Sequence, residues 1–169
     1  MNSAVQCLRH IPFVREAVGH VDFENLGREA EVAKSFLKLT QSCDEVADYG
    51  CVSPEELRNS MSNKTFTDDD QHDCQEFLRV MMDELHDDLN RVKVRPKPEK
   101  EVEDDDNEPE TAKALRLWKS YLSHNNSPII DIFGGQLQSS ICCSVCKTKY
   151  TCYEPFLDLS VPIPQGKSG

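Results

Sequence analysis

The sequence lacks any long hydrophobic run. No apolar stretch in its 169 residues approaches the roughly 20 residues of a membrane-spanning helix, so no membrane insertion is expected. The segment from Met1 to His10 also lacks a charged start followed by an apolar core, so no secretory signal is expected. These absences predict an intracellular protein of the cytoplasm, the nucleus or both.

Basic residues are in the minority. The chain has 19 Lys and Arg against 30 Asp and Glu, which gives a net charge of −11. A polyanion is repelled by nucleic acid and by acidic lipid headgroups, so neither is expected as a partner, whereas basic protein partners remain open. Part of the charge lies in residues 93–111, a Pro-, Lys- and acid-rich stretch that we interpret as a flexible acidic insert.

The sequence contains no internal repeats. Its N-terminal part shows capping residues and apolar periodicity that are typical of helices. From Gln71 to Arg91 apolar residues recur at helical spacing, and Asp68–Asp70 before them offer a cap. Pro12 and Pro128 are each interpreted as ending or stopping a helix. Capping and periodicity predict further helices over about 2–11, 28–42, 53–61 and 111–124.

The period changes to two further on. Residues 137–143 and 157–163 alternate apolar with polar side chains, which predicts two strands. Helices followed by strands indicate an α+β fold. Because a lone pair of strands is marginally stable, further strands are expected to complete the sheet.

Cys143 and Cys146 form a C-x-x-C between the predicted strands. The eight cysteines are unevenly spaced and no signal peptide is visible, which argues against a disulfide framework. In an intracellular chain the pair is typical of half a metal site or of a redox pair.

Three stretches stand out, namely Met1–Leu8, Gln71–Leu78 and Gly135–Ile163. Together they resemble the ubiquitin-specific protease family of deubiquitinating cysteine peptidases. Met1–Leu8 resembles the end of its Cys box, N-T-C-F/Y-M-N-S-x-x-Q-x-L, and Gln71–Leu78 resembles its Q-Q-D-A-Q-E-F-L box. Gly135–Ile163 resembles the strand, zinc knuckle and strand of its fingers region. The three occur in the family's order and cover nearly the whole chain.

The resemblance implies a papain-like fold that hydrolyses the bond after ubiquitin's C-terminal glycine, with ubiquitin and ubiquitinated proteins as partners. It implies a helical thumb over residues 1–92, the insert over 93–111, and the last thumb helix and start of the fingers over 112–169, with the domain continuing. The nucleophilic cysteine would lie two positions before Met1 and the His box after Gly169. The chain alone is therefore expected to be inactive.

The same resemblance assigns Gln71 and Asp73 to the cleft that holds ubiquitin's tail. Helix capping is the alternative for both residues. The cleft role is favoured because Asp68–Asp70 already offer caps, and because carboxylates would pair with the arginines of that tail. The resemblance also implies that Cys143 and Cys146 supply half of a four-cysteine structural zinc site, with a second pair after Gly169.

The remaining thiols and imidazoles are expected to have structural roles. Cys7 and Cys74 are predicted to be core residues, because free cysteine is among the most buried residue types. His86, like three other histidines, is predicted to lie on the surface or a helix face. A non-catalytic pseudo-deubiquitinase or ubiquitin-binding module is the alternative function. A small zinc or redox protein would leave the Gln71–Leu78 stretch unexplained.

Overall fold

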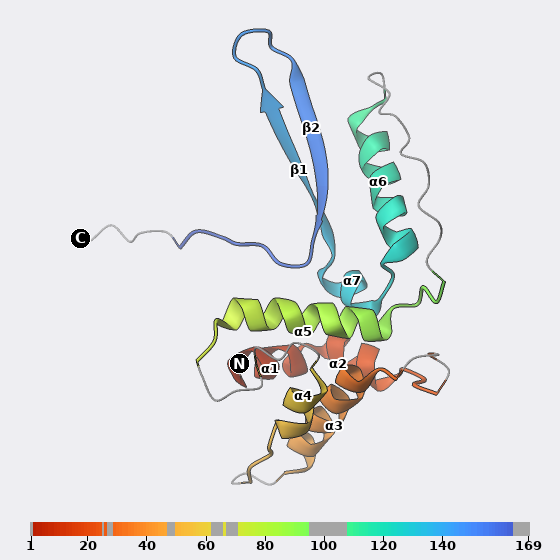
Figure 1. Ribbon diagram of the computed structural model, residues 1–169, viewed down its shortest axis with the longest axis vertical. Helices are drawn as coiled ribbons and strands as arrows, with labels where there is room; N and C mark the ends of the chain where they lie inside the picture. The colour runs from red at the N-terminus through yellow and green to blue at the C-terminus, as the bar shows by residue number, and fades with distance from the viewer. Residues whose placement is uncertain are drawn as a thin grey trace, which may run out of the picture.

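A computed structural model describes residues 2–24, 26, 29–46, 50–61, 66, 71–94 and 108–163. Within these residues there are seven helices and one antiparallel pair of strands (Figure 1). The elements are α1 (Asn2–His10), α2 (Pro12–Gly19), α3 (Glu31–Glu45), α4 (Glu55–Ser60), α5 (Cys74–Leu89), α6 (Glu110–His124), α7 (Pro128–Phe133), β1 (Gly135–Cys142) and β2 (Lys149–Phe156). This mixture of helices with a small antiparallel sheet agrees with the predicted α+β class.

The core lies where α5 packs against α1, α3 and α7. The apolar face of α5 is buried, and Figure 1 shows this helix lying across the layer formed by α1 to α4. Met81 and Leu85 have no exposed surface, and neither have Val14 of α2, Ala33 of α3 and Ile129 of α7. None of the helices in the described residues is long and apolar enough to cross a membrane.

The strands form a hairpin that rises beside α6, away from the helical core (Figure 1). Gly135 pairs with Phe156 at one end and Cys142 with Lys149 at the other. Glu110, in the first turn of α6, links this helix to the hairpin. Its carboxylate accepts hydrogen bonds from Lys149 at 2.6 Å and Gln138 at 3.1 Å, and its backbone carbonyl accepts one from the Tyr153 hydroxyl.

Periodicity located the longer helices, and α1 and α6 end before Pro12 and Pro128 as predicted, but two short helices were missed. Pro12 and Pro128 do not only end what precedes them, because each is the first residue of a helix that was not predicted, α2 and α7. Proline is favoured there, since its fixed φ suits the helix and the first turn needs no N–H donor. Residues 53–61 contain α4 as predicted.

Other boundaries also differ from the predicted ones. The helix expected from Gln71 begins at Cys74, and α6 begins at Glu110, so Thr111 lies inside it. The second strand is Lys149–Phe156 and not 157–163, because the short turn after Cys142 fixes its register on β1. The C-x-x-C does lie in that turn. Most of the predicted insert, residues 95–107, lies outside the described residues.

Of the two predicted places for His86, the surface or a helix face, the structure shows the second: His86 lies on the buried face of α5. Its Nδ1 lies 2.7 Å from Ser127 Oγ, and its Nε2 lies 3.3 Å from Asn125 Oδ1. Ser127 Oγ also accepts the Ile130 N–H at 3.2 Å and so caps α7. We infer that the Ser127 hydroxyl donates to Nδ1, while Nε2–H donates to Asn125. The His86 imidazole therefore joins α5 to the cap of α7.

Ser127→Ala should lower the free energy of unfolding by about 1–3 kcal/mol, because it removes a helix cap and leaves buried His86 Nδ1 without its partner. The matched control is Ser123→Ala on α6, where an exposed hydroxyl donates to Ser120 O. This control should change stability by less than about 0.5 kcal/mol. Urea unfolding of both variants gives the comparison, and equal effects would contradict the assignment.

Candidate functional site

Three stretches that are far apart in the sequence meet at the start of α5. Ser3 Oγ, in the first turn of α1, lies 3.9 Å from Cys74 Sγ. The side-chain amide of Gln75 donates hydrogen bonds through Nε2 to Asp158 Oδ2 at 3.0 Å and to Ser160 Oγ at 3.5 Å. The segment after β2 therefore crosses α5 close to the helix start, as Figure 1 shows. The three sequence motifs thus border one region of the surface.

Asp73 is the N-cap of α5. Its Oδ1 accepts the backbone N–H of Gln75 at 2.7 Å and that of Glu76 at 3.0 Å. The sequence offered Asp68–Asp70 as the caps of this helix. Asp73 itself caps α5, because its extended backbone places the carboxylate over the first-turn N–H groups. Asp68–Asp70 lie outside the described residues. Both Asp73 and Gln71 are exposed, so capping leaves the carboxylate at the surface.

The exposed side of α5 is predominantly acidic near its start. A depression of about 350 Å³ is lined by the carboxylates of Asp73, Glu76 and Asp83. Among its described lining residues, Arg79 is the one that carries a positive charge. Burial raises the pKa of the Asp83 carboxyl, while the charge of Arg79 acts in the opposite direction. A surface of this kind favours a cationic ligand.

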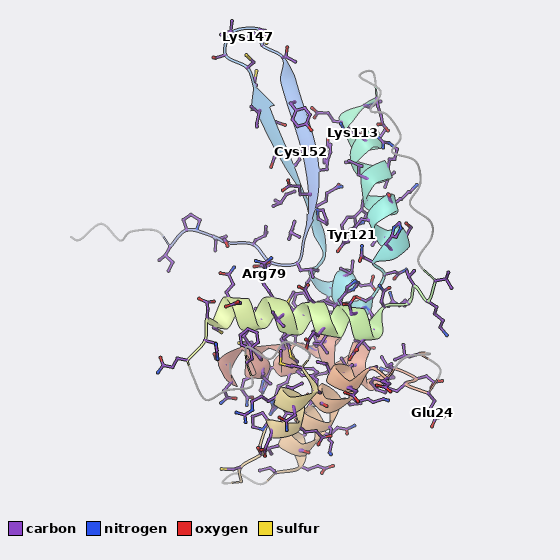
Figure 2. All side chains as sticks on the ribbon, viewed as in Figure 1. Glu24, Arg79, Lys113, Tyr121, Lys147 and Cys152 are labelled. Atoms are coloured by element: carbon purple, nitrogen blue, oxygen red, sulfur yellow. The ribbon has the colours of Figure 1, made fainter. Side chains whose placement is uncertain are left out.

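A second depression, of about 280 Å³, continues toward α6. Arg79 and Asp83 of α5, Tyr121 of α6 and Asp158 after β2 all line it. Arg79 Nε forms an exposed ion pair with Asp158 Oδ1 at 3.8 Å. Burial, and to a lesser extent the charge of Asp83, raises the pKa of Tyr121. Figure 2 shows Arg79 on the side of α5 that faces the crossing segment, and Tyr121 on α6.

These residues show what the sequence reasoning missed. Gln75 and Asp158 stand inside the recognised motifs, but no role was predicted for either. Their hydrogen bond joins positions 83 residues apart, which no local pattern reveals. Arg79 and Asp83 follow Glu76 at intervals that keep them on one side of the helix, and that spacing could have indicated them.

Cys7 and Cys74 are exposed, so the prediction that they are core residues was wrong. In α1 the buried side chains are Ala4, Val5 and Leu8, and Cys7 faces away from them. Cys74 is the first helical residue of α5 and lies before the apolar face begins at Phe77. Helix geometry, and not the preference of cysteine for burial, decides both positions.

Cys143 and Cys146 lie in the turn at the tip of the hairpin, where Figure 2 marks Lys147. Lys147 has a positive φ of 61°, and its N–H donates to Cys143 O at 3.0 Å. Cys146 Sγ lies 3.3 Å from the Thr148 hydroxyl. Hydrogen bonding, chiefly to Thr148, lowers the pKa of the Cys146 thiol to about 7. Among the described residues no group of three or more His, Cys, Asp or Glu is arranged to hold a metal.

Known proteins resemble the chain over nearly its whole length. The sequence profile of the family described as Ubiquitin carboxyl-terminal hydrolase matches residues 1–162. Ubiquitin carboxyl-terminal hydrolase 8 of Arabidopsis thaliana is 35% identical over 97% of this chain and 19% of its own length. Ubiquitin carboxyl-terminal hydrolase 2 of Rattus norvegicus is 36% identical over 96% of this chain and 27% of its own length.

Ubiquitin carboxyl-terminal hydrolase 15 of Bos taurus is 34% identical over 99% of this chain and 18% of its own length. The chain belongs to the ubiquitin carboxyl-terminal hydrolase family, as its three motifs predicted. It spans about a fifth to a quarter of the length of these relatives.

The Cys146 thiol should be alkylated with a pH midpoint near 7 in the metal-free chain, because the Thr148 hydroxyl stabilises the thiolate. Thr148→Val should move this midpoint to higher pH and slow labelling at neutral pH. Mass spectrometry after iodoacetamide pulses at a series of pH values measures both effects. The exposed thiol of Cys51 is the control and should respond equally in both chains. An unchanged Cys146 midpoint in Thr148→Val would contradict the stated cause.

Proposed function

We propose that this chain forms the thumb and the beginning of the fingers of a papain-like, ubiquitin-specific cysteine peptidase. The reaction is hydrolysis of the bond after ubiquitin's C-terminal glycine, on ubiquitinated proteins in the cytoplasm, the nucleus or both. The observation that carries the proposal is the meeting of the three motifs: Ser3 of the first contacts Cys74 of the second, and Gln75 binds Asp158 of the third.

Gln71 and Asp73 bind ubiquitin's tail in this proposal. Both are exposed at the start of α5, next to the first turn of α1. Asp73 caps α5 through Oδ1 and still presents its carboxylate to solvent. Glu76 and Asp83 extend the negative surface away from Asp73. Arginine side chains of an extended tail would form charge-assisted hydrogen bonds with such carboxylates.

In this proposal the chain binds ubiquitin and does not supply the nucleophilic cysteine. The family pattern places the reactive cysteine and the His box outside residues 1–169. Cys7 and Cys74 are not proposed to replace them, because an activated thiol needs an adjacent base and the polar group in contact with Cys74 is the Ser3 hydroxyl. Ubiquitin binding is therefore the activity to measure on this chain.

Cys143 and Cys146 would hold a structural zinc ion together with two further ligands. The chemistry of the donors fits, because both thiols are exposed in one tight turn and the pKa of Cys146 is already lowered toward the thiolate form that zinc binds. Zinc in structural sites takes four ligands, so the remaining two would come from outside the described residues. When bound, the ion would cross-link the hairpin tip to whatever supplies them.

Asp73→Asn separates the two roles of this side chain. Asparagine caps helices about as well as aspartate, so thermal unfolding should hardly change. Loss of the charge should weaken ubiquitin binding about ten- to a hundredfold, which corresponds to about 1.5–3 kcal/mol. Calorimetric titration with ubiquitin measures the affinity.

Two further variants complete that experiment. Asp73→Ala should show the same loss of affinity and should also lose about 1 kcal/mol of stability, because the cap is removed. Asp131→Asn, at an exposed carboxylate of α7 that pairs with Arg91, is the matched control and should bind normally. If Asp73→Asn bound ubiquitin as the unmodified chain does, Asp73 would be a cap alone.

Zinc uptake should be weak and below one ion per chain, because only two of the four thiolates are present. Cys146→Ser should abolish it, whereas Cys51→Ser should leave it unchanged. Elemental analysis after dialysis against zinc gives the stoichiometry. One tightly held zinc in the Cys146→Ser variant would show that other residues form the site.

A further inference from the structure

Arg79 is a basic side chain on the acidic outer side of α5, and it lines both of the depressions described above. Asp83 also lines both, one helical turn further along the same side. Because 65% of the Arg79 side chain is exposed, its guanidinium has room to turn toward Asp83 or toward the segment that follows β2. The direction in which it turns decides how acidic the depression at the start of α5 is.

In the structure Arg79 turns toward the segment after β2 (Figure 2). Among the described residues, the carboxylate that forms an ion pair with Arg79 is Asp158, whose Oδ1 lies 3.8 Å from Nε. The other carboxylate oxygen, Oδ2, accepts the hydrogen bond from Gln75 Nε2 at 3.0 Å. Gln75 and Arg79 are one turn apart on α5, so two side chains of this helix hold one carboxylate. Only 34% of the Asp158 side chain is exposed, which makes it the better fixed partner of the pair.

Asp83 is close enough to compete for the same guanidinium. Burial raises the pKa of Asp83, the charge of Arg79 lowers it, and the charge of Asp158 raises it. The three charges therefore act on one another across the depression of about 280 Å³ that all three residues line. An exposed ion pair contributes little free energy, so the loss of one carboxylate would redirect Arg79 to the other.

We propose that Asp158 is a positioning residue that holds Arg79 away from the acidic depression at the start of α5, and that Arg79 is a specificity-determining residue there. This inference rests on the proposed function, in which arginines of ubiquitin's tail bind that acidic surface. With Arg79 held by Asp158, the carboxylates face the ligand's guanidinium groups. Without the charge of Asp158, Arg79 would turn toward Asp83 and neutralise part of the surface that the tail needs.

Asp158→Asn tests this role in the full chain. Asparagine keeps an oxygen that accepts from Gln75, but it lacks the charge that holds Arg79. The variant should bind ubiquitin about three- to fivefold more weakly, which is the scale of one exposed ion pair. Arg79→Gln removes the competing cation, so it should bind at least as tightly as the unmodified chain. In that background Asp158→Asn should weaken binding less than twofold. Calorimetric titration gives the four affinities.

A role of Asp158 that is only structural predicts a different result. If Asp158 merely anchored the segment after β2, its substitution would weaken binding equally with and without Arg79. That outcome, or unchanged affinity in Asp158→Asn, would overturn the proposal. Salt gives a second measurement, because the difference between Asp158→Asn and the unmodified chain should shrink as exposed charges are screened. A difference that persists at high salt would also contradict the proposal.

The matched control is Asp131→Asn, which removes the exposed carboxylate that pairs with Arg91 and changes the net charge by the same amount. It should bind ubiquitin normally, and a loss equal to that of Asp158→Asn would show that net charge alone acts.

A blocked diarginine peptide, titrated by NMR, separates this inference from the proposed function. It offers the guanidinium groups without the rest of ubiquitin, so the four chains should bind it in the same order of affinity. If the peptide shows that order and ubiquitin does not bind, the proposed function fails and the role of Arg79 stands. If ubiquitin binds all four chains alike, the proposed function stands and the role of Arg79 is wrong. Binding of neither ligand would refute both.

Discussion

The burial of one face of α5 is the interaction on which the other elements depend. Met81 and Leu85 are fully buried among α1, α3 and α7. The same helix supplies polar contacts to its neighbours. Asp88 Oδ2 accepts the Ala33 N–H at 2.9 Å, which caps α3 at a start where Ala30 offers no capping side chain. His86 binds the cap of α7. Because α5 both packs and caps, a shift of this helix would disturb several helix ends together.

The same arrangement explains why the candidate site lies at the start of α5. The inner face must be apolar, so polar groups gather at the helix start and on the outer side. Asp73 satisfies first-turn N–H groups and remains exposed, so one carboxylate serves the helix and the surface together. A capping aspartate is held in position by the helix it caps, which lowers the conformational entropy lost when it binds a ligand. Capping and ligand binding are therefore compatible at this position.

The sequence predicted the elements whose patterns lie in neighbouring residues. Prediction failed where contacts between residues far apart in the chain determine the structure. Periodicity predicted most of α5 and β1, and the C-x-x-C was correctly expected in the turn. The helices that begin at Pro12 and Pro128 were missed, because proline both stops and starts helices and only packing selects between these outcomes. Burial of His86 depends on a partner 41 residues away. The candidate site is a proposal that rests on the motifs, whereas the contact between Gln75 and Asp158 is seen only in the fold.

The hairpin is the part of the fold least supported by the core. A lone two-stranded sheet is marginal in water, and Ile141 and Tyr150 remain exposed on this one. Among the described residues, Glu110 makes most of the hydrogen bonds that join the hairpin to α6. The pKa of its carboxyl is lowered chiefly by the hydrogen bond from Lys149. A lowered carboxyl pKa contributes stability at neutral pH that is lost as the pH falls through the folded-state value, and at an exposed site salt screens it. The metal cross-link proposed at Cys143 and Cys146 would reinforce the same end of the hairpin, because Lys149 pairs with Cys142 directly beside that turn.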